Sequence, residues 1–171
     1  ASTFSGGLTI KAGTLRLGAS ERLLDSGVLM MEGGILDLNG NLETVGVFNL
    51  QGGFVKGGSL LASAFDLQNG TVSTAFTGTA RLLKTTEGTV VLTGRSDYTG
   101  GTFVDAGVLL LGGVNRLPET GVVNLRGGTL DLGGYVQLGG ALTVESGMLL
   151  NGRYVGSEYT VESGSIGAVL G

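Results

Sequence analysis

The sequence of 171 residues contains no cysteine, histidine or tryptophan, and it has one proline. The absence of cysteine excludes a disulfide scaffold and a zinc finger. Without histidine or cysteine there is no Ser-His-Asp or Cys-His catalytic arrangement, and only carboxylate or carbonyl metal sites of the calcium type remain. No run of about 18 apolar residues is present, so no segment is expected to enter a membrane as a helix.

Charge is also scarce, because charged residues make up 14% of the chain. Ten Lys and Arg stand against fourteen Asp and Glu, which gives a net charge of -4 without any basic cluster. Nucleic acid is therefore not an expected partner. The mean hydropathy of +0.36 excludes a disordered chain.

Glycine is the residue in excess, with 35 copies in the chain. This is about 20% of the residues, against a usual ~7%. Glycine does not recur at every third position, and proline is nearly absent, so a collagen helix is excluded.

A long internal repeat explains part of this pattern. The segment FSGGLTIKAGTLRLG, which begins at Phe4, is similar to YTGGTFVDAGVLLLG, which begins at Tyr98. The match runs without a gap from residues 4–77 to residues 98–171, an offset of 94 residues. We therefore expect a duplicated structure within one solenoid segment over residues 1–171, which is part of a longer protein.

A shorter unit of roughly 19 residues lies inside the long repeat, and it reads as an apolar stretch, a polar residue, a small residue, glycine and a second apolar stretch. Nine units follow one another. Their central glycines are Gly13, Gly34, Gly53, Gly70, Gly88, Gly107, Gly128, Gly147 and Gly164.

The side chains around each central glycine alternate with the period of a β-strand. The residue two positions after the glycine is always apolar. The position three before it is apolar in eight of nine units, with Thr85 as the exception. The position five before it is also apolar in eight of nine units, with Thr102 as the exception, and in the unit of Gly88 this position is Leu83. The position two before it is always polar, as at Glu145 and Glu162. The apolar positions should face a common interior and the polar position the solvent.

This pattern predicts an all-β parallel β-helix, in which each unit forms one coil of two or three short strands stacked on the previous coil. At ~4.8 Å per coil, nine coils give a rod about 43 Å long. The stretch SERLLDS (20–26) looks helical, but its repeat partner VNRLPET contains Pro118. Because proline is poorly tolerated inside a helix, we expect both stretches to be long turns.

The segment LLKTTEGTVVLTGRSDYTGGTFVDAGVLLLG (82–112) resembles the passenger-associated repeat of bacterial autotransporters. The similar positions include Lys84, Gly88 and Thr89, then Tyr98 to Thr102, while Asp97 stands where the family usually has Asn. The resemblance implies a right-handed β-helical passenger, with two 94-residue blocks here acting as a structural stalk or spacer. It also implies a location outside the cell or at the cell surface, where the full-length protein is tethered to or secreted through the outer membrane. The expected partners are a host surface or another copy of the chain.

An alternative is a carbohydrate-active or glycan-binding β-helix, either a polysaccharide lyase or hydrolase or a tailspike-like binder. Glycoside hydrolysis needs two carboxylates ~5–9.5 Å apart. Glu145 and Glu162 on adjacent coils are the nearest candidate pair, although a solvated outer ladder is the favoured explanation for them. Asp37 and Asp131 lie five coils apart, too far to cooperate. We therefore predict a non-enzyme without catalytic residues, cofactor or metal ion.

A set of apolar residues on the expected outer face is the one candidate binding feature. Val91, Val108 and Leu110 should lie on adjacent coils, and Ile35 and Phe54 form a second pair. Clustered apolar residues on a surface can mark a contact with a partner. Single exposed apolar residues are common, so ordinary strand residues are the competing interpretation.

Overall fold

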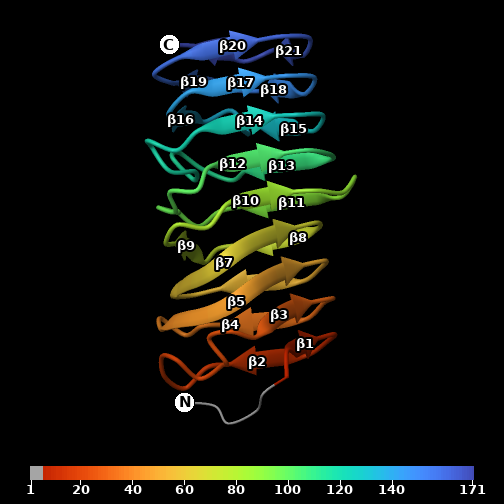
Figure 1. Cartoon of the computed structure of the whole chain (residues 1–171), viewed down its shortest axis with the longest axis vertical. Helices are drawn as coiled ribbons and strands as arrows, with labels where there is room; N and C mark the ends of the chain where they lie inside the picture. Colours follow the sequence, from red (N-terminus) through yellow and green to blue (C-terminus); the bar gives the residue numbers. More distant parts are fainter. Residues whose placement is uncertain (1–5) are drawn as a thin grey trace.

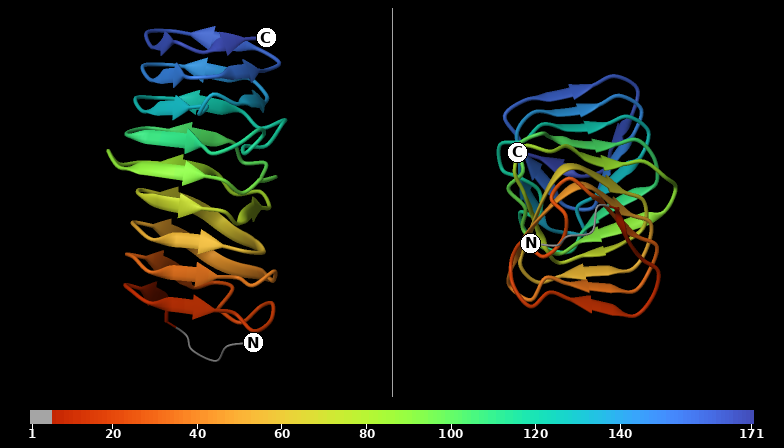
Figure 2. Two further views of the ribbon diagram at one scale, coloured as in Figure 1. Left: turned by 180° about the vertical axis from the view of Figure 1, so that it is seen from behind. Right: turned by 60° about the horizontal axis from the view of Figure 1, so that its bottom comes forward.

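The computed structural model describes residues 6–171, so Phe4 and Ser5, where the repeat begins, lie outside the described residues. Within this range the chain forms a stack of coils with three parallel sheets along its length and no helix (Figures 1 and 2). The expected all-β solenoid of about nine coils is confirmed. The stretch 20–26 is an irregular turn, as its proline-containing partner indicated.

The first sheet has ten strands, and nine of them follow one another up the stack. They are β1 (Leu8–Ile10), β3 (Val28–Met31), β5 (Leu42–Leu50), β7 (Ser59–Leu67), β10 (Leu82–Lys84), β12 (Thr102–Val104), β14 (Val123–Leu125), β17 (Leu142–Val144) and β20 (Tyr159–Val161). The tenth strand, β9 (Ala75–Thr77), pairs with the first half of β7.

The second sheet contributes one strand to each of the nine coils. Its strands are β2 (Thr14–Arg16), β4 (Ile35–Asp37), β6 (Phe54–Lys56), β8 (Gly70–Val72), β11 (Thr89–Leu92), β13 (Val108–Leu111), β15 (Thr129–Asp131), β18 (Met148–Leu150) and β21 (Ser165–Ile166). The third sheet is short and covers only the last coils. It contains β16 (Val136–Leu138), β19 (Arg153–Val155) and β22 (Val169–Leu170).

The interior of the stack is filled by ladders of apolar side chains, one above the other in successive coils. Leu109 pairs in register with Leu130, which pairs with Leu149, and all three are fully buried. The middle coils add an aromatic group in which the Phe65 and Phe76 rings stack at 4.2 Å. One coil cannot bury its apolar face alone, and the stack supplies the cover from both sides.

A tight corner joins the two strands of each coil, and its geometry explains the recurring glycine. Gly34 has a φ of +71°, and a Cβ there would lie 2.6 Å from the carbonyl oxygen of Gly13 in the coil below. Only glycine combines a positive φ with such a close approach at no steric cost. The backbone geometry of the corner therefore restricts which residues can occupy it, independently of any function.

In the fifth coil, the side chains that point into the interior differ from those predicted from the sequence. Alternation placed Leu83 and Thr85 in the interior, whereas the structure aligns Leu82 with Phe65 and Lys84 with Leu67. Lys84 is consequently fully buried and Thr85 is exposed. The cause is a corner one residue longer than that of the next coil, since three residues separate Lys84 from Gly88 and two separate Val104 from Gly107.

Candidate functional site

The apolar residues proposed from the sequence lie on the outer face of the second sheet. Ile35 pairs with Phe54, and Val91 pairs with Leu110. A two-residue shift of β11 relative to β8 brings these pairs into one ladder, because both Phe54 and Val91 pair with Thr71. We call these four residues, together with Val108 two positions before Leu110 on the same strand, the second-sheet ladder. All five are half-buried, because each side chain shields its neighbours in adjacent coils.

A more exposed group of apolar side chains lies elsewhere, on the outer face of the third sheet and next to it. Its members are Val114, Tyr135, Val136, Leu138 and Val169, with exposures from 36% to 60%. We call them the third-sheet patch. Arg153 lies within it, because β19 pairs Arg153 with both Val136 and Val169.

Sequence reasoning missed the third-sheet patch because one polar residue reverses the expected facing. Alternation through Val136, Gln137 and Leu138 suggests that the glutamine points outward. In the structure Gln137 is buried, accepts a hydrogen bond from the backbone N–H of Leu117 and donates to the Leu117 carbonyl at 3.0 Å. These bonds replace a missing strand partner, so both valine and leucine point to solvent.

The polar position before each corner faces outward, as predicted, and forms ion pairs up the stack. Lys11 lies 3.3 Å from Glu32, and Arg126 binds both carboxylate oxygens of Asp105 at 2.7 and 2.9 Å. Glu145 accepts a hydrogen bond from the Asn124 side chain at 2.7 Å. These contacts are those expected if the polar residues before the corners form a solvated ladder of cross-strand pairs.

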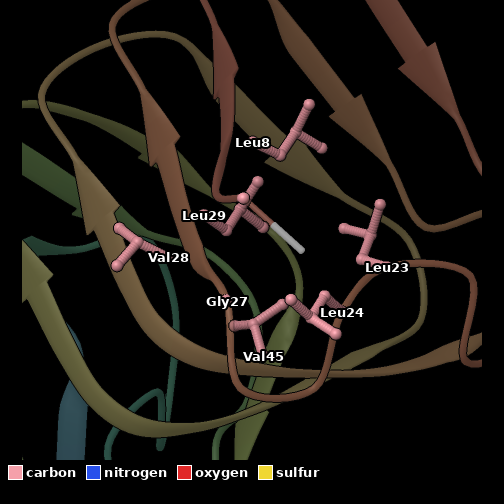
Figure 3. Close-up of a pocket in the computed structure, with 8 residues that line it drawn as sticks. Leu8, Leu23, Leu24, Gly27, Val28, Leu29 and Val45 are labelled. Atoms are coloured by element: carbon pink, nitrogen blue, oxygen red, sulfur yellow. The ribbon is translucent and has the colours of Figure 1, made fainter. Parts of the chain in front are cut away.

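The surface formed by residues 6–171 includes one small and two larger hollows. The first, in Figure 3, is lined by apolar residues including Leu8, Leu23 and Leu29, and its volume of about 10 Å³ is no larger than one water. Two larger hollows of about 380 and 210 Å³ lie on either side of the segment from Arg95 to Asp97. Arg95 and Asp97 line both, and the Arg95–Glu119 ion pair borders one of them.

Among the described residues, three ionisable groups have shifted pKa values, and burial is the main cause each time. It raises the pKa of Tyr98 and Tyr154 above the usual tyrosine range, and it lowers that of Lys84 despite the opposing effect of the Glu87 and Asp66 carboxylates. The Tyr98 hydroxyl is 2.6 Å from that of Thr102, and both side chains are buried. Tyr98, which follows the turn of the repeat motif, therefore belongs to the core.

No metal-binding group is formed by the described residues: nowhere in 6–171 do three Asp or Glu side chains come together. The same range contains no helix able to cross a membrane. The surface thus offers ladders, patches and shallow hollows as the places where a partner could bind.

Comparison with known proteins connects this architecture to a family. The model of the passenger-associated-transport-repeat matches residues 1–17 and 82–111, and the second match covers the motif around Tyr98. The chain carries the repeats of an autotransporter passenger domain. Both matched stretches end at equivalent positions of the long repeat, because Leu17 and Leu111 are 94 residues apart.

A curated relative agrees with the autotransporter assignment. The chain is 33% identical over 162 residues to the adhesin BmaC autotransporter of Brucella suis biovar 1 (strain 1330), which covers 82% of this chain. The chain spans only 4% of the length of that protein. No solved structure matches the chain. As an autotransporter passenger, this segment is located outside the cell, at the bacterial surface.

Proposed function

We propose that this passenger segment is a rigid stalk or spacer without catalytic activity. The supporting observation is the uninterrupted stack, in which both main sheets contribute a strand to each of the nine coils. Each coil hydrogen-bonds along its length to the next, so the rod cannot bend without breaking ladder bonds. Such a stack converts chain length into distance at ~4.8 Å per coil.

The repeat allows a direct test of the spacer function. An extra copy of residues 4–97 inserted before residue 98 preserves the coil phase, because the offset is 94 residues. Small-angle scattering should show the maximum dimension rising by about 24 Å at constant cross-section. A flexible glycine-serine insert of equal length is the control. A larger cross-section would contradict the continuous rod.

The same block tests the role in the longer passenger on the cell surface. Deleting residues 4–97 should leave surface display unchanged and reduce binding that depends on reach. An unrelated solenoid of equal length should then restore binding. Restoration only by the original sequence would contradict a spacer and indicate direct contact.

Adhesion through the segment itself is the second candidate function. It is supported by the Brucella suis relative, which is named an adhesin, and by the second-sheet ladder. Purified segment carrying Phe54→Ser and Leu110→Ser should lose binding to host cells or matrix proteins if this surface makes the contact. A matched variant with Leu83→Ser on the outer face of the first sheet should bind normally, and equal loss in both would refute the assignment.

The carbohydrate-active alternative rests on Glu145 and Glu162, which the structure places on adjacent coils. The hydrogen bond from Asn124 to Glu145 supports a structural role for that carboxylate. We therefore expect no turnover in a polysaccharide screen. Reproducible cleavage that disappears in Glu145→Gln would overturn this expectation.

Self-association of the isolated segment is also part of the proposal. Val161 in β20 is 51% exposed, whereas Val144, its partner in the coil below, is fully buried. The edge beyond β20 thus presents unpaired strand groups next to apolar side chains, which is a template for another parallel coil. A second copy of the chain would supply that coil in solution.

A further inference from the structure

The corner between β10 and β11 lacks the backbone bonds that tie other corners to the coil below. At a regular corner the first amides donate downward, as Gln51 N–H does to Met31 and Asp105 N–H does to Lys84, both at 2.8 Å. Over the described range, the Thr85 and Thr86 amides make no such bond to the β7 strand. In Figure 1 this corner projects beyond its neighbours.

The two halves of the solenoid also meet out of phase at this corner. In the second sheet Leu92 pairs with Val72, whereas every regular step pairs residues at the same distance from the central glycine, as Val90 does with Leu109. The step from β8 to β11 is therefore shifted by two residues. The fifth coil has to hold this shift together with a corner that is one residue longer.

Two side chains add hydrogen bonds at this corner. The Lys84 ammonium donates to the Thr86 carbonyl of its own corner and to the Ala106 carbonyl of the next coil, the latter at 3.2 Å. The Thr86 hydroxyl donates to the Gln68 carbonyl of the coil below at 3.1 Å. The corner is thus tied upward by a lysine and downward by a threonine.

The Lys84 ammonium belongs to a side chain buried among apolar neighbours, which is costly for a charged group unless hydrogen bonds compensate. Its ladder neighbours Leu67 and Val104 are both fully buried and apolar, and Lys84 itself has no exposed surface. An ammonium group without hydrogen-bond partners would be strongly unfavourable there. Both observed acceptors are corner carbonyls, so the charge is directed at the irregular backbone.

We propose that Lys84 and Thr86 act as a lock on the fifth corner: Thr86 ties the corner across the shifted step to the coil below, and Lys84 closes the corner and holds it to the coil above. The Thr86 hydroxyl takes the place of the missing amide bonds to the coil below, and the Lys84 ammonium adds a side-chain bond to the coil above, which the corner also reaches through the Asp105 N–H bond to the Lys84 carbonyl. Release of the lock opens residues 85–88 locally while the other coils stay stacked. This role is independent of whether the rod serves as a spacer or as an adhesin.

Glu87 provides a reporter inside the corner, because it is exposed and a glutamate-specific protease cleaves after it. The test compares the rate of cleavage after Glu87 in the whole 171-residue chain and in Lys84→Met, which keeps the length of the side chain and removes its donors. Removing a buried charge can raise global stability, so the readout must be local. We expect cleavage at least about tenfold faster in the variant, since the rate follows the population of the open corner.

Leu125→Met is the matched control, two coils further along the same ladder and close in volume, and it should leave the rate at Glu87 unchanged. An unchanged or slower rate in Lys84→Met would overturn the proposal. If that variant does not fold, Thr86→Val decides, because it removes only the hydroxyl bond to Gln68. Cleavage about threefold faster is expected there, and an unchanged rate would overturn the lock.

Discussion

The facing of the strands is tested most sharply by truncating two neighbouring leucines of β13. Leu109 is fully buried between Val90 and Leu130, whereas Leu110 is half-buried on the outer face. Leu109→Ala leaves a cavity in a ladder that is fixed by strand spacing on both sides. We expect it to lower the free energy of unfolding by about 2–5 kcal/mol, the range for buried leucine truncation.

Leu110→Ala removes the same atoms from a site that solvent already reaches. Its expected cost is about 1 kcal/mol or less, because most surface substitutions are small. A chain of this size loses about 2–4 °C of melting temperature per kcal/mol. The melting temperature should therefore fall by about 4–20 °C in Leu109→Ala and by less than about 4 °C in Leu110→Ala. Differential scanning calorimetry with chemical denaturation as a second probe would measure both.

Equal destabilisation by the two alanine variants would refute the facing of the second sheet. Charged substitutions at buried positions and an alanine substitution at an outward position test the same assignment, with the yield of folded protein as the measurement. Leu109→Asp and Leu130→Asp should abolish folding, because an unpaired charge inside the stack costs several kcal/mol. Glu145→Ala, at the outward polar position, should change stability by under ~1 kcal/mol.

Three further predictions concern pH, ion pairs and association. Burial raises the pKa of Tyr98, so above about pH 10 the unfolded chain loses a proton that the folded chain keeps, and stability should fall as pH rises; the fall, followed by urea midpoints, should be smaller in Tyr98→Phe. Asp105→Ala should cost at most about 1 kcal/mol, since its pair with Arg126 is more than a third exposed, and a larger loss in denaturant titrations would contradict a surface role. Light scattering should show concentration-dependent end-to-end association, suppressed by Val161→Lys with Ile166→Lys, and a strictly monomeric parent at the highest concentration would exclude it.

The sequence alone determined the coil count, the corner positions and most of the interior. The reason is physical: stacked coils place equivalent residues in equivalent surroundings, so a column such as Leu109, Leu130 and Leu149 repeats the same requirement and is visible in one chain. The corner glycines are visible for the same reason, since most of them approach a carbonyl oxygen of the coil below. The passenger repeat motif was visible because its turn and its core tyrosine, Tyr98, are part of this periodic framework.

Only the tertiary structure decided the facing where a coil breaks the period. Alternation cannot show that Lys84 and Gln137 point inward, because polarity suggests the opposite and the deciding contacts are backbone groups of other coils. The shift between β8 and β11, which joins Phe54 and Val91 through Thr71, likewise depends on pairing between coils and leaves no local trace in the sequence. Hydrogen-bond satisfaction of the irregular backbone outweighed side-chain polarity at these positions, and it set both the lock and the exposed third-sheet patch.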